Sequence, residues 1–316
     1  MTVTASGFFI DRLDGVFLTH THSDHVGGME TLASNRSVQS LYSSVFSQNK
    51  DSGENKIEEI ARDLSLVHQK LRAGDRVMIT DDVFFEVLGP MAFNAEDDND
   101  NSLVMKLKAF GRTFLFAGDM QFAGEAVLLR SGIDLDADVL KVGNHGNSDA
   151  TSEQFAGAVS PEHAVISTDT TQDADSANER VLTALRGANV YITENFACGV
   201  LMTVQKDGAI HVSSPTLPKT AANIVVTGID RDMQTVTIKN LGPDIDISGF
   251  VLLSQREGEV FIFPEGSWLK SGQSVAVSSR LGSDYLWPGK AKVWHQEKDV
   301  SALLFDRFGN FLSSGN

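Results

Sequence analysis

The sequence predicts a layered α/β domain followed by an all-β sandwich. Strand-like and helix-like stretches alternate as far as residue 213, which is typical of an α/β fold. The segment SSPTLPKTAAN (213–223) is rich in proline and small polar residues, which indicates a linker. After it, short alternating stretches are separated by turn residues, a pattern that favours a sandwich. We therefore expect a first domain at 1–213, a linker at 214–221 and a second domain at 222–316.

The composition is that of a globular protein of two domains. The chain has 316 residues, of which 41% are hydrophobic, enough for ordinary cores. No stretch approaches the ~20 apolar residues of a membrane span, so no transmembrane segment is expected. The only cysteine, Cys198, excludes an intrachain disulfide but does not decide the compartment. The opening residues, MTVTASGFFI, lack the basic start and long apolar core of a signal peptide.

The net charge of −16 is concentrated in the first domain. Residues 1–215 hold 16 Lys and Arg against 31 Asp and Glu, whereas residues 216–316 hold 10 against 11. Proteins that bind long nucleic acids normally present a basic surface. The composition therefore argues against a basic groove, and any nucleic-acid function has to bring phosphate to a locally positive site.

The elements of the first domain follow from their periodicity. Residues 57–71 place apolar side chains on one helical face, which predicts a helix. Shorter helices are expected at 122–130 and 177–187, the second closed by Gly187. The acidic residues of AEDDNDN (95–101) are interpreted as a solvated turn. Apolar and β-branched runs predict strands at 15–19, 84–88, 102–110, 113–118, 138–143, 163–167 and 189–193.

One short stretch concentrates side chains that bind metals. FLTHTHSDHVGGME (17–30) holds three of the eight histidines, in the spacing His-x-His-x-Asp-His. Imidazoles two residues apart can project from one tight loop and bind one cation, while the Asp and His beyond them can reach a second. The glycines that follow let the backbone turn closely behind the loop. The stretch follows a predicted strand, at the end where α/β sheets bind ligands; the alternative is a polar surface loop.

This motif resembles the first metal motif of the metallo-β-lactamase superfamily. Further stretches follow in the order and spacing of the hydrolase domain of ComEC-type competence proteins, over about residues 10–213: NDNSLVMKL (99–107), FLFAGDM (114–120) and ADVLKVGNHGN (137–147). The fold implied by the resemblance is a four-layer αββα sandwich with a metal site at one edge.

The resemblance also implies the roles of individual residues. His20 and His22 would bind one divalent ion, Asp24 and His25 another, and Asp119 would bridge the two. From the residues alone, Asp119 could instead cap the helix that follows it. His145 is implied as a ligand or substrate contact, with a supporting place behind a ligand as the alternative. The implied cofactor is one or two divalent ions, Zn²⁺ or Mn²⁺.

The sequence departs from the family pattern at three places. The His-His-Gly motif reads Asn144-His145-Gly146 here. Asn144 can still offer an oxygen, which suits Mn²⁺ or Mg²⁺, and we count it with Asn101 among the candidate substrate contacts. A His-Pro expected near the last helix is replaced by DADSAN (173–178). The chain begins too late to contain the Asp-Gly-Gly strand pair that opens the family domain, which indicates a truncated sequence. If this is the real start, we expect one sheet to lack its first strands and leave exposed edges.

The implied chemistry is hydrolysis by a metal-activated water. A divalent ion lowers the pKa of bound water to ~7, and two ions ~3.5–4 Å apart can hold both oxygens of a phosphodiester displacement. Asp24 is the candidate to orient or deprotonate the water, with Asp119 and His145 completing the catalytic set. The substrate would be nucleic acid or another phosphodiester. Metal charge can outweigh the local acidity, but we expect weak binding of long nucleic acids that is insensitive to salt.

The second domain resembles a lamin-tail domain, a small immunoglobulin-like sandwich. The resemblance rests on the runs NLGPDIDISG (240–249), FPEGSWLKSG (263–272) and LFDRFGN (304–310). It implies a binding or tethering module for a protein, nucleic-acid or cell-envelope partner. We expect the apolar side chains of its strands in the core rather than at an interface: Phe261, Phe263 and Trp268.

Two hypotheses of different class follow. The first is a metal-dependent nuclease or phosphodiesterase. The second is a binding protein that keeps the fold and part of the site but has little or no activity, and it rests on Asn144, the absent last-helix His and the missing first strands. Both resemblances imply a protein that acts outside the cytoplasm or at its membrane.

Overall fold

The chain folds into two compact units. The computed structural model describes residues 12–196, 199–205, 207–214, 219–256, 259–288, 292–295 and 300–316. Within this part of the chain the α/β unit comprises residues 14–26 and 38–214, and the sandwich unit comprises 12–13, 27–37 and 219–316. Cys198 and half of the predicted linker, 215–218, lie outside the described residues. The proposed domain boundaries stay a prediction.

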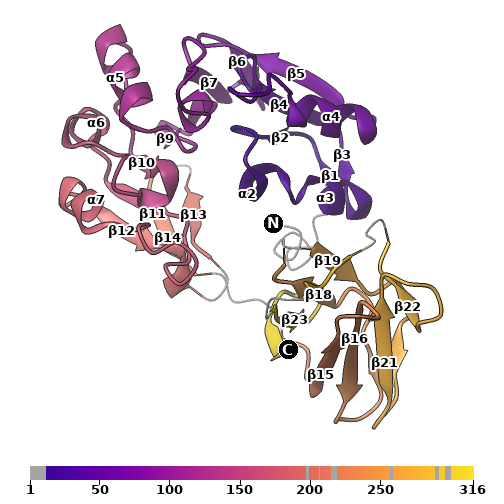
Figure 1. Cartoon of the computed structure of the whole chain (residues 1–316). Helices are drawn as coiled ribbons and strands as arrows, with labels where there is room; N and C mark the ends of the chain where they lie inside the picture. The colour runs from indigo at the N-terminus through magenta and orange to yellow at the C-terminus, as the bar shows by residue number, and fades with distance from the viewer. Residues whose placement is uncertain are drawn as a thin grey trace. The chain divides into compact units, whose positions relative to one another are not determined.

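The α/β unit is built around a seven-stranded sheet (Figure 1). Its strands lie in the order β12-β11-β10-β9-β8-β7-β6. Strands β6 to β9 pair antiparallel, whereas β9 to β12 run parallel. The parallel half brings the carboxyl ends of β9 and β10 to the same edge, so the turns that follow them are neighbours. The strands are β6 Arg76–Met78, β7 Val83–Gly89, β8 Val104–Ala109, β9 Arg112–Phe116, β10 Val139–Lys141, β11 His163–Ile166 and β12 Asn189–Ile192.

A smaller parallel sheet packs on one face of this sheet. It consists of β2 Val16–Phe17, β4 Ser40–Ser44 and β5 Val67–Leu71. Phe17 stacks on Tyr42 with ring centroids 4.6 Å apart and meets Phe85 of β7 at 4.9 Å. Buried side chains fill the space between the sheets: Leu71, Val87, Leu103 and Met105. The unit therefore has two sheets face to face.

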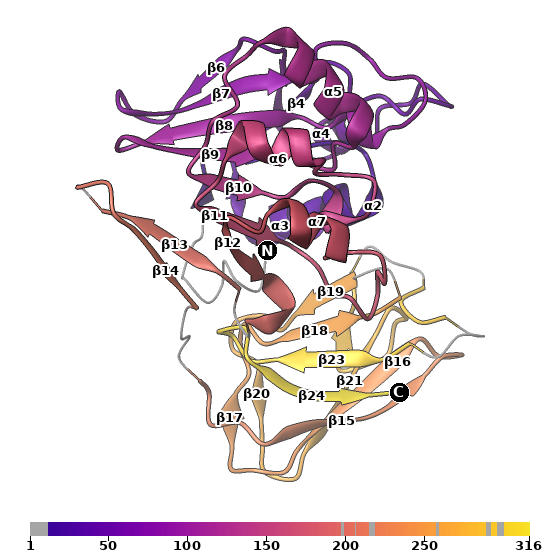
Figure 2. The same cartoon turned by 90° about the vertical axis from the view of Figure 1, so that its left-hand side faces the viewer.

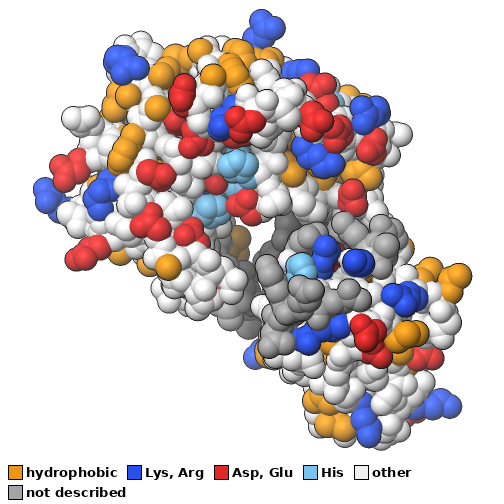
Figure 3. All heavy atoms as spheres, viewed as in Figure 1, with side chains coloured by type: hydrophobic (Ala, Val, Ile, Leu, Met, Phe, Trp, Pro, Cys, Tyr) orange, Lys and Arg blue, Asp and Glu red, His pale blue; other side chains and the backbone are white. Residues whose placement is uncertain are grey.

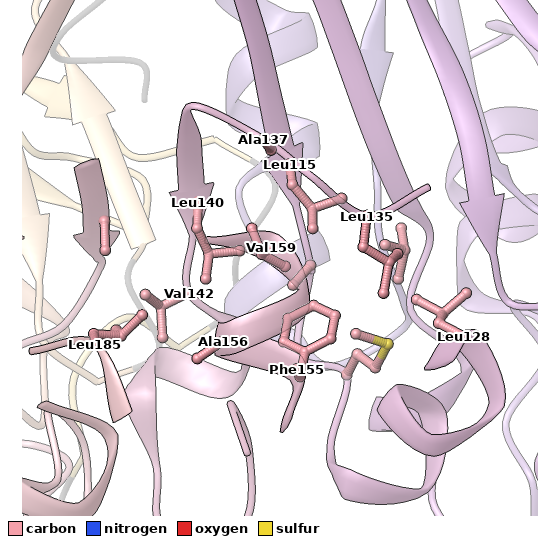
Figure 4. Packing of buried hydrophobic residues seen from close by; sticks show 14 of the residues in the cluster. Leu115, Leu128, Leu135, Ala137, Leu140, Val142, Phe155, Ala156, Val159 and Leu185 are labelled. Atoms are coloured by element: carbon pink, nitrogen blue, oxygen red, sulfur yellow. The ribbon is translucent and has the colours of Figure 1, made fainter. Parts of the chain in front are cut away.

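Helices form the outer layers. Figure 2 shows α5, α6 and α7 along one face of the seven-stranded sheet, and Figure 1 shows α4 beside β4 and β5. Figure 4 shows the apolar contacts between the sheet and its helices, with Leu128 of α5 and Phe155 of α6 both buried. This arrangement confirms the predicted αββα layers. The helices are α4 Lys56–Asp63, α5 Phe122–Ser131, α6 Glu153–Val159 and α7 Glu179–Ala184.

The helix predicted at 57–71 is wrong in its second half. Helix α4 ends at Asp63, and Ser65 adopts a positive φ of 53°. Residues 67–71 form β5, which pairs in parallel with β4. A left-handed backbone stops a helix, and pairing with a distant strand is invisible in the periodicity of one segment.

The sandwich unit consists mainly of two four-stranded sheets. Their orders are β15-β16-β21-β22 and β19-β18-β23-β24, accompanied by the pair β17-β20. Side chains from both sheets share one core around the buried Trp294, which confirms the predicted all-β sandwich. The strands are β15 Ile224–Asp230, β16 Thr235–Asn240, β17 Ile245–Asp246, β18 Val251–Ser254, β19 Glu259–Ile262, β20 Trp268–Leu269, β21 Ser274–Ser278, β22 Tyr285–Leu286, β23 Ala302–Phe305 and β24 Phe311–Gly315.

The predicted core of the sandwich holds for two of its three named residues. Phe261 and Phe263 are buried. Trp268 is 61% exposed, so its assignment to the core is wrong. Its neighbour Leu269 is fully buried, and because successive side chains of a strand point to opposite faces, Trp268 faces solvent.

The remaining elements are short. They are β1 Arg12–Leu13 paired with β3 Ser37–Val38, the hairpin β13 Leu201–Val204 and β14 Ile210–Ser213, the helices α2 Ser23–Val26 and α3 Met29–Asn35, and the 3₁₀ turns η1 Asn99–Asn101, η2 Gly143–Gly146 and η3 Thr193–Asn195. In the described part of the chain, no helix is both long enough and apolar enough to cross a membrane.

Truncation of the helix-facing core should destabilise the α/β unit. Phe155 is 1% exposed at the centre of that core, and Phe155→Ala should lower the free energy of unfolding by about 3–5 kcal/mol. Phe110→Ala, at a position 53% exposed, should change it by about 0.5 kcal/mol or less. Urea unfolding followed by circular dichroism measures both. Equal losses in the two variants would contradict this assignment of the core.

Candidate metal centre

Three turns bring the predicted ligands together at one edge of the α/β unit. Asp24 and His25 lie on α2 after β2, Asp119 follows β9, and His145 lies in η2 after β10. One ligand atom of each of these four residues lies within 4.8 Å of all the others. Figure 3 shows histidine side chains reaching the surface beside acidic ones, close to where α2 lies in Figure 1.

The two imidazoles meet both carboxylates. His25 Nε2 lies 2.9 Å from Asp119 Oδ2 and 3.1 Å from Asp24 Oδ2. His145 Nε2 lies 3.3 Å from each of the same two oxygens. Nitrogen and carboxylate donors in this combination suit Zn²⁺ or Mn²⁺. The four residues can therefore bind one divalent ion.

His20 and His22 stand beside this group. The ring of His20 lies 4.5 Å from that of His22 and 4.2 Å from that of His25. His20 Nε2 lies 3.9 Å from Asp119 Oδ2. His20 Nε2 and Asp119 Oδ1 are buried, and neither has a hydrogen-bond partner among the described residues. Such buried polar atoms are costly unless something binds them, and a cation is a partner that both accept, so the residues present fit a metal site.

The close packing of charges shifts the pKa values of the group. Burial, together with the neighbouring His25, lowers the pKa of His20 to about 3. Burial also opposes protonation of His25, but hydrogen bonds to Asp119 and Asp24 raise its pKa to about 9. Hydrogen bonds to the same two carboxylates raise the pKa of His145 to about 10. Without a cation, the site therefore contains two imidazolium groups that occupy the place of metal charge.

The carboxylates shift in the opposite direction. Hydrogen bonds from His145 and His25 hold the pKa of Asp24 well below its usual range. Burial would raise the pKa of Asp119, but hydrogen bonds from the same imidazoles outweigh it and keep that pKa low. Both carboxylates are therefore ionised at neutral pH, as metal ligands must be.

Gly118 allows the turn that carries Asp119. Its φ is +58°, and a Cβ there would lie 2.7 Å from the Cβ of Ser102 and 3.2 Å from that of Thr19. Only glycine fits such a close approach in this conformation. Ser102 Oγ accepts a hydrogen bond of 3.0 Å from the backbone N–H of Asp119. The turn is thus packed tightly onto the residues behind it.

The acidic run 95–101 is not a simple solvated turn, which corrects the prediction. Asp100 is buried, and its carboxylate accepts hydrogen bonds of 2.9 Å from the backbone N–H groups of Gln121 and Gly124. Asp98 is buried as well and bonds to residues 49–50. The first N–H groups of a helix lack partners within it, so Asp100 caps α5 from outside.

The alternative role of Asp119 as a helix cap is not observed. The residue that precedes α5 is Gln121, and its side chain does not cap the helix. Asp119 instead turns its carboxylate toward the histidines.

The loop that carries His145 is held in a strained conformation. Asn144, His145 and Gly146 all have positive φ, at 42°, 52° and 75°. Such angles cost of order 1–3 kcal/mol for residues other than glycine and persist only where the surroundings impose them. His145 Nδ1 donates to Ser167 O at 2.7 Å, and residues 177–178 bond to the loop carbonyls. In this backbone conformation, His145 Nε2 faces the carboxylates of Asp24 and Asp119.

The two asparagines named as substrate contacts are engaged within the protein. Asn144 Nδ2 donates to Asp149 Oδ1 at 2.8 Å. Asn101 is 1% exposed, and its carboxamide both donates to and accepts from the backbone of Asn94. A substrate contact by Asn144 or Asn101 stays a prediction, and for Asn101 this geometry gives it no support.

Two residues that contact the candidate ligands were not predicted from the sequence. The Thr19 hydroxyl contacts His20 and His25, and the Ser102 hydroxyl contacts His20. Thr19 directly precedes the first histidine of the motif, and this position is the one local signal that it contacts the site. Ser102 lies 82 residues beyond His20 and gives no such signal.

The fold and the site define a two-sheet α/β domain with a cluster of His and Asp side chains that is compatible with metal binding. The sequence profile of the Metallo-beta-lactamase superfamily matches residues 3–170, and the chain belongs to this superfamily. It is 31% identical over 192 residues to ComE operon protein 3 of Bacillus subtilis (strain 168), across 60% of this chain and 24% of that protein. It is 29% identical over 193 residues to Competence protein ComA of Neisseria gonorrhoeae, across 61% and 25%. The chain spans about a quarter of the length of these relatives.

A partial structural likeness was also found. CmlA, a diiron beta-hydroxylase from Streptomyces venezuelae, matches with a TM-score of 0.43 and 12% identity, over 57% of this chain and 43% of CmlA. Likeness at this level says nothing about activity. The family match ends at residue 170, so the resemblance of the sandwich to a lamin-tail domain stays a prediction.

The pKa shifts predict how the stability of the metal-free protein depends on pH. The raised values of His25 and His145 contribute stability that is fully present below pH 6.5, their ordinary value, and is lost as pH rises through about 9 and 10. The lowered values of Asp24 and Asp119 contribute stability above pH 3.8 that is lost as pH falls. Because the pKa of His20 is lowered to about 3, protonation of this residue in the unfolded chain reduces stability as pH falls below 6.5. In the presence of a chelator, this site should therefore stabilise the fold most near pH 6.5.

Thermal unfolding of the wild type and of His145→Gln across this range measures the effect. The difference in Tm should shrink as pH rises from 6.5 to about 10, because the wild type loses its charged pairs. A difference that grows over that interval would contradict the assignment.

The same charges predict that metal binding releases protons. His25 and His145 are protonated at pH 7 in the absence of a cation, and a metal binds only the deprotonated imidazole. The affinity should therefore rise as pH increases toward 9. Calorimetric titration with Zn²⁺ in two buffers of different ionisation enthalpy measures the release, which His145→Gln should reduce. A binding enthalpy that is the same in both buffers would refute the prediction.

Proposed function

We propose that the protein is a metal-dependent phosphodiesterase that cleaves nucleic acid. The observation that carries this proposal is the convergence of Asp24, His25, Asp119 and His145 within 4.8 Å, with His20 and His22 directly beside them. Membership of the superfamily supports a hydrolase, and a mixed set of carboxylates and imidazoles is the donor set of metal-assisted hydrolysis.

The residues fall into two ligand groups. Asp24, His25 and His145 with Asp119 would hold one ion, and His20 and His22 with Asp119 would hold another. When bound, a divalent ion lowers the pKa of water and neutralises charge that develops on the phosphate oxygens. Asp119 belongs to both groups because its Oδ2 lies near His20, His25 and His145.

The solvent exposure of the side chains separates their roles. The side chain of Asp24 is 58% exposed, that of His145 27% and that of Asp119 only 5%. Asp24 can therefore accept a proton from an incoming water, and His145 is open to an ion that enters from solvent. Asp119 is too deeply buried to meet substrate, so it serves to hold and orient the histidines.

DNA is the phosphodiester that we propose as the substrate. One relative is named for the ComE operon and the other as a competence protein, and DNA uptake is the process we propose for this chain. The acidity of the first domain supports weak, salt-insensitive binding of long DNA. The same kinship supports a location outside the cytoplasm or at its membrane, and the sandwich unit would tether the enzyme to a protein or cell-envelope partner.

A binding protein with little activity is the second candidate. Asn144 replaces a family histidine, and its carboxamide is bonded to Asp149 rather than to the four-residue group. A loss of one ligand would weaken one metal position.

Replacement of Asp24 should lower turnover strongly and leave the fold intact. Loaded with Mn²⁺ or Zn²⁺, the wild type should hydrolyse bis(4-nitrophenyl) phosphate and single-stranded DNA, and a chelator should stop both reactions. Asp24→Asn should lower kcat/KM about 10²- to 10⁴-fold, the usual contribution of a general base. Asp51→Asn, which changes a carboxylate 78% exposed in a surface ion pair, serves as the matched control and should be unchanged.

The same assay separates the two candidates. Absence of turnover in a wild type that binds metal would overturn the phosphodiesterase and favour the binding protein.

A further inference from the structure

The hydroxyl of Thr19 lies between two of the metal-site histidines. Thr19 Oγ1 is 3.1 Å from His20 Nδ1 and 3.1 Å from His25 Nδ1. Ser102 lies between η1 and β8, and its Oγ is 3.3 Å from the same His20 Nδ1. Both rings thus turn Nδ1 toward hydroxyl groups and Nε2 toward the carboxylates.

The surroundings of His20 decide which ring nitrogen carries its proton. A neutral imidazole has one N–H donor and one acceptor nitrogen. A proton on Nδ1 meets the oxygens of Thr19 and Ser102. A proton on Nε2 would be a buried donor without a hydrogen-bond partner among the described residues, which is costly. His20 therefore carries its proton on Nδ1, and Nε2 keeps a free lone pair.

His25 is oriented in the same way, and a cation that displaces its Nε2 proton leaves it in the same tautomer. Its Nε2 faces Asp24 and Asp119, and its Nδ1 faces Thr19. A hydroxyl oxygen has two acceptor lone pairs, so Thr19 can accept one hydrogen bond from each Nδ1–H. A single side chain can thereby satisfy both rings.

We propose that Thr19 is a positioning residue that holds His20 and His25 in the same tautomer, with the proton on Nδ1 and Nε2 presented to the cations. The inference rests on the metal centre of the proposed function and adds to it a residue outside the ligand set. His20 and His25 belong to different ligand groups, so Thr19 couples the two positions. Groups that fix the tautomer of a metal-binding histidine raise its affinity for the metal.

Thr19 is itself held in place by the fold. Its carbonyl accepts a hydrogen bond of 2.9 Å from Leu103 N–H, just ahead of β8. Its Cβ lies against the glycine turn at Gly118. These contacts leave the backbone in place when the hydroxyl is removed, so the Thr19→Val substitution tests the hydroxyl alone.

Metal affinity is the first test. Competition with a chromogenic chelator gives the affinity for Zn²⁺, and mass spectrometry gives the number of ions per chain. Thr19→Val, which has the same shape without the hydroxyl, should weaken binding about 10- to 100-fold, the usual cost of losing such a partner. Thr19→Ser should retain the wild-type affinity. Thr183→Val, the same exchange at an exposed position of α7, should leave binding unchanged.

The tautomers are read directly in the wild type. Two-bond ¹⁵N–¹H correlation spectra of the histidine-labelled, Zn²⁺-loaded protein should show both rings protonated at Nδ1. Protonation of either ring at Nε2, or unchanged affinity in a folded Thr19→Val, would overturn the inference while leaving the phosphodiesterase intact. A wild type that binds no metal would overturn the proposed function, and the spectrum of metal-free His20 would still decide the inference, since an Nε2–H there contradicts it.

Discussion

The buried carboxylate of Asp119 is the interaction on which the rest of the site depends. Its Oδ2 lies within 3.3 Å of His25 and His145 and 3.9 Å from His20, so three histidines from two separate turns are arranged around one oxygen. An ionised carboxylate that is 5% exposed is tolerated only with positive partners. The packed sheet holds Asp119 in place after β9, and Gly118 allows the turn that presents it. Without that charge, only the exposed carboxylate of Asp24 would pair with the two cationic imidazoles.

The demand for positive charge links this local arrangement to the chemistry. Protonated His25 and His145 satisfy Asp119 and Asp24 when no metal is bound, which is why their pKa values rise to about 9 and 10. A divalent ion can replace those protons and release them. The site is therefore prepared for cations within a domain that is otherwise strongly acidic, and that local reversal of charge is what a phosphodiester would meet.

The cost of the site is met by packing elsewhere in the unit. Consecutive positive φ values at Asn144 and His145 store strain that an isolated loop would release. The hydrogen bonds to Ser167 and from residues 177–178 keep the loop in this conformation. The buried core under helices α5 to α7 holds in place the strands from which the loop extends. Asp100 also stabilises this edge of the sheet, because it caps α5 directly after the turn that carries Asp119. The geometry of the site therefore depends on side chains that contact neither a metal nor a substrate.

The sequence by itself determined the class of the fold and predicted the candidate ligands. The candidate ligands His20, His22, Asp24 and His25 lie within six residues, so their chemistry is visible as a local pattern, whereas Asp119 and His145 are implied by the family resemblance. Only the tertiary structure decided the strand at 67–71, the exposure of Trp268 and the burial of Asp98 and Asp100. It alone decided the contacts of Thr19 and Ser102 as well. These features depend on partners distant in the chain, and a hydrogen bond or a buried face between distant segments leaves no periodic signal in either one.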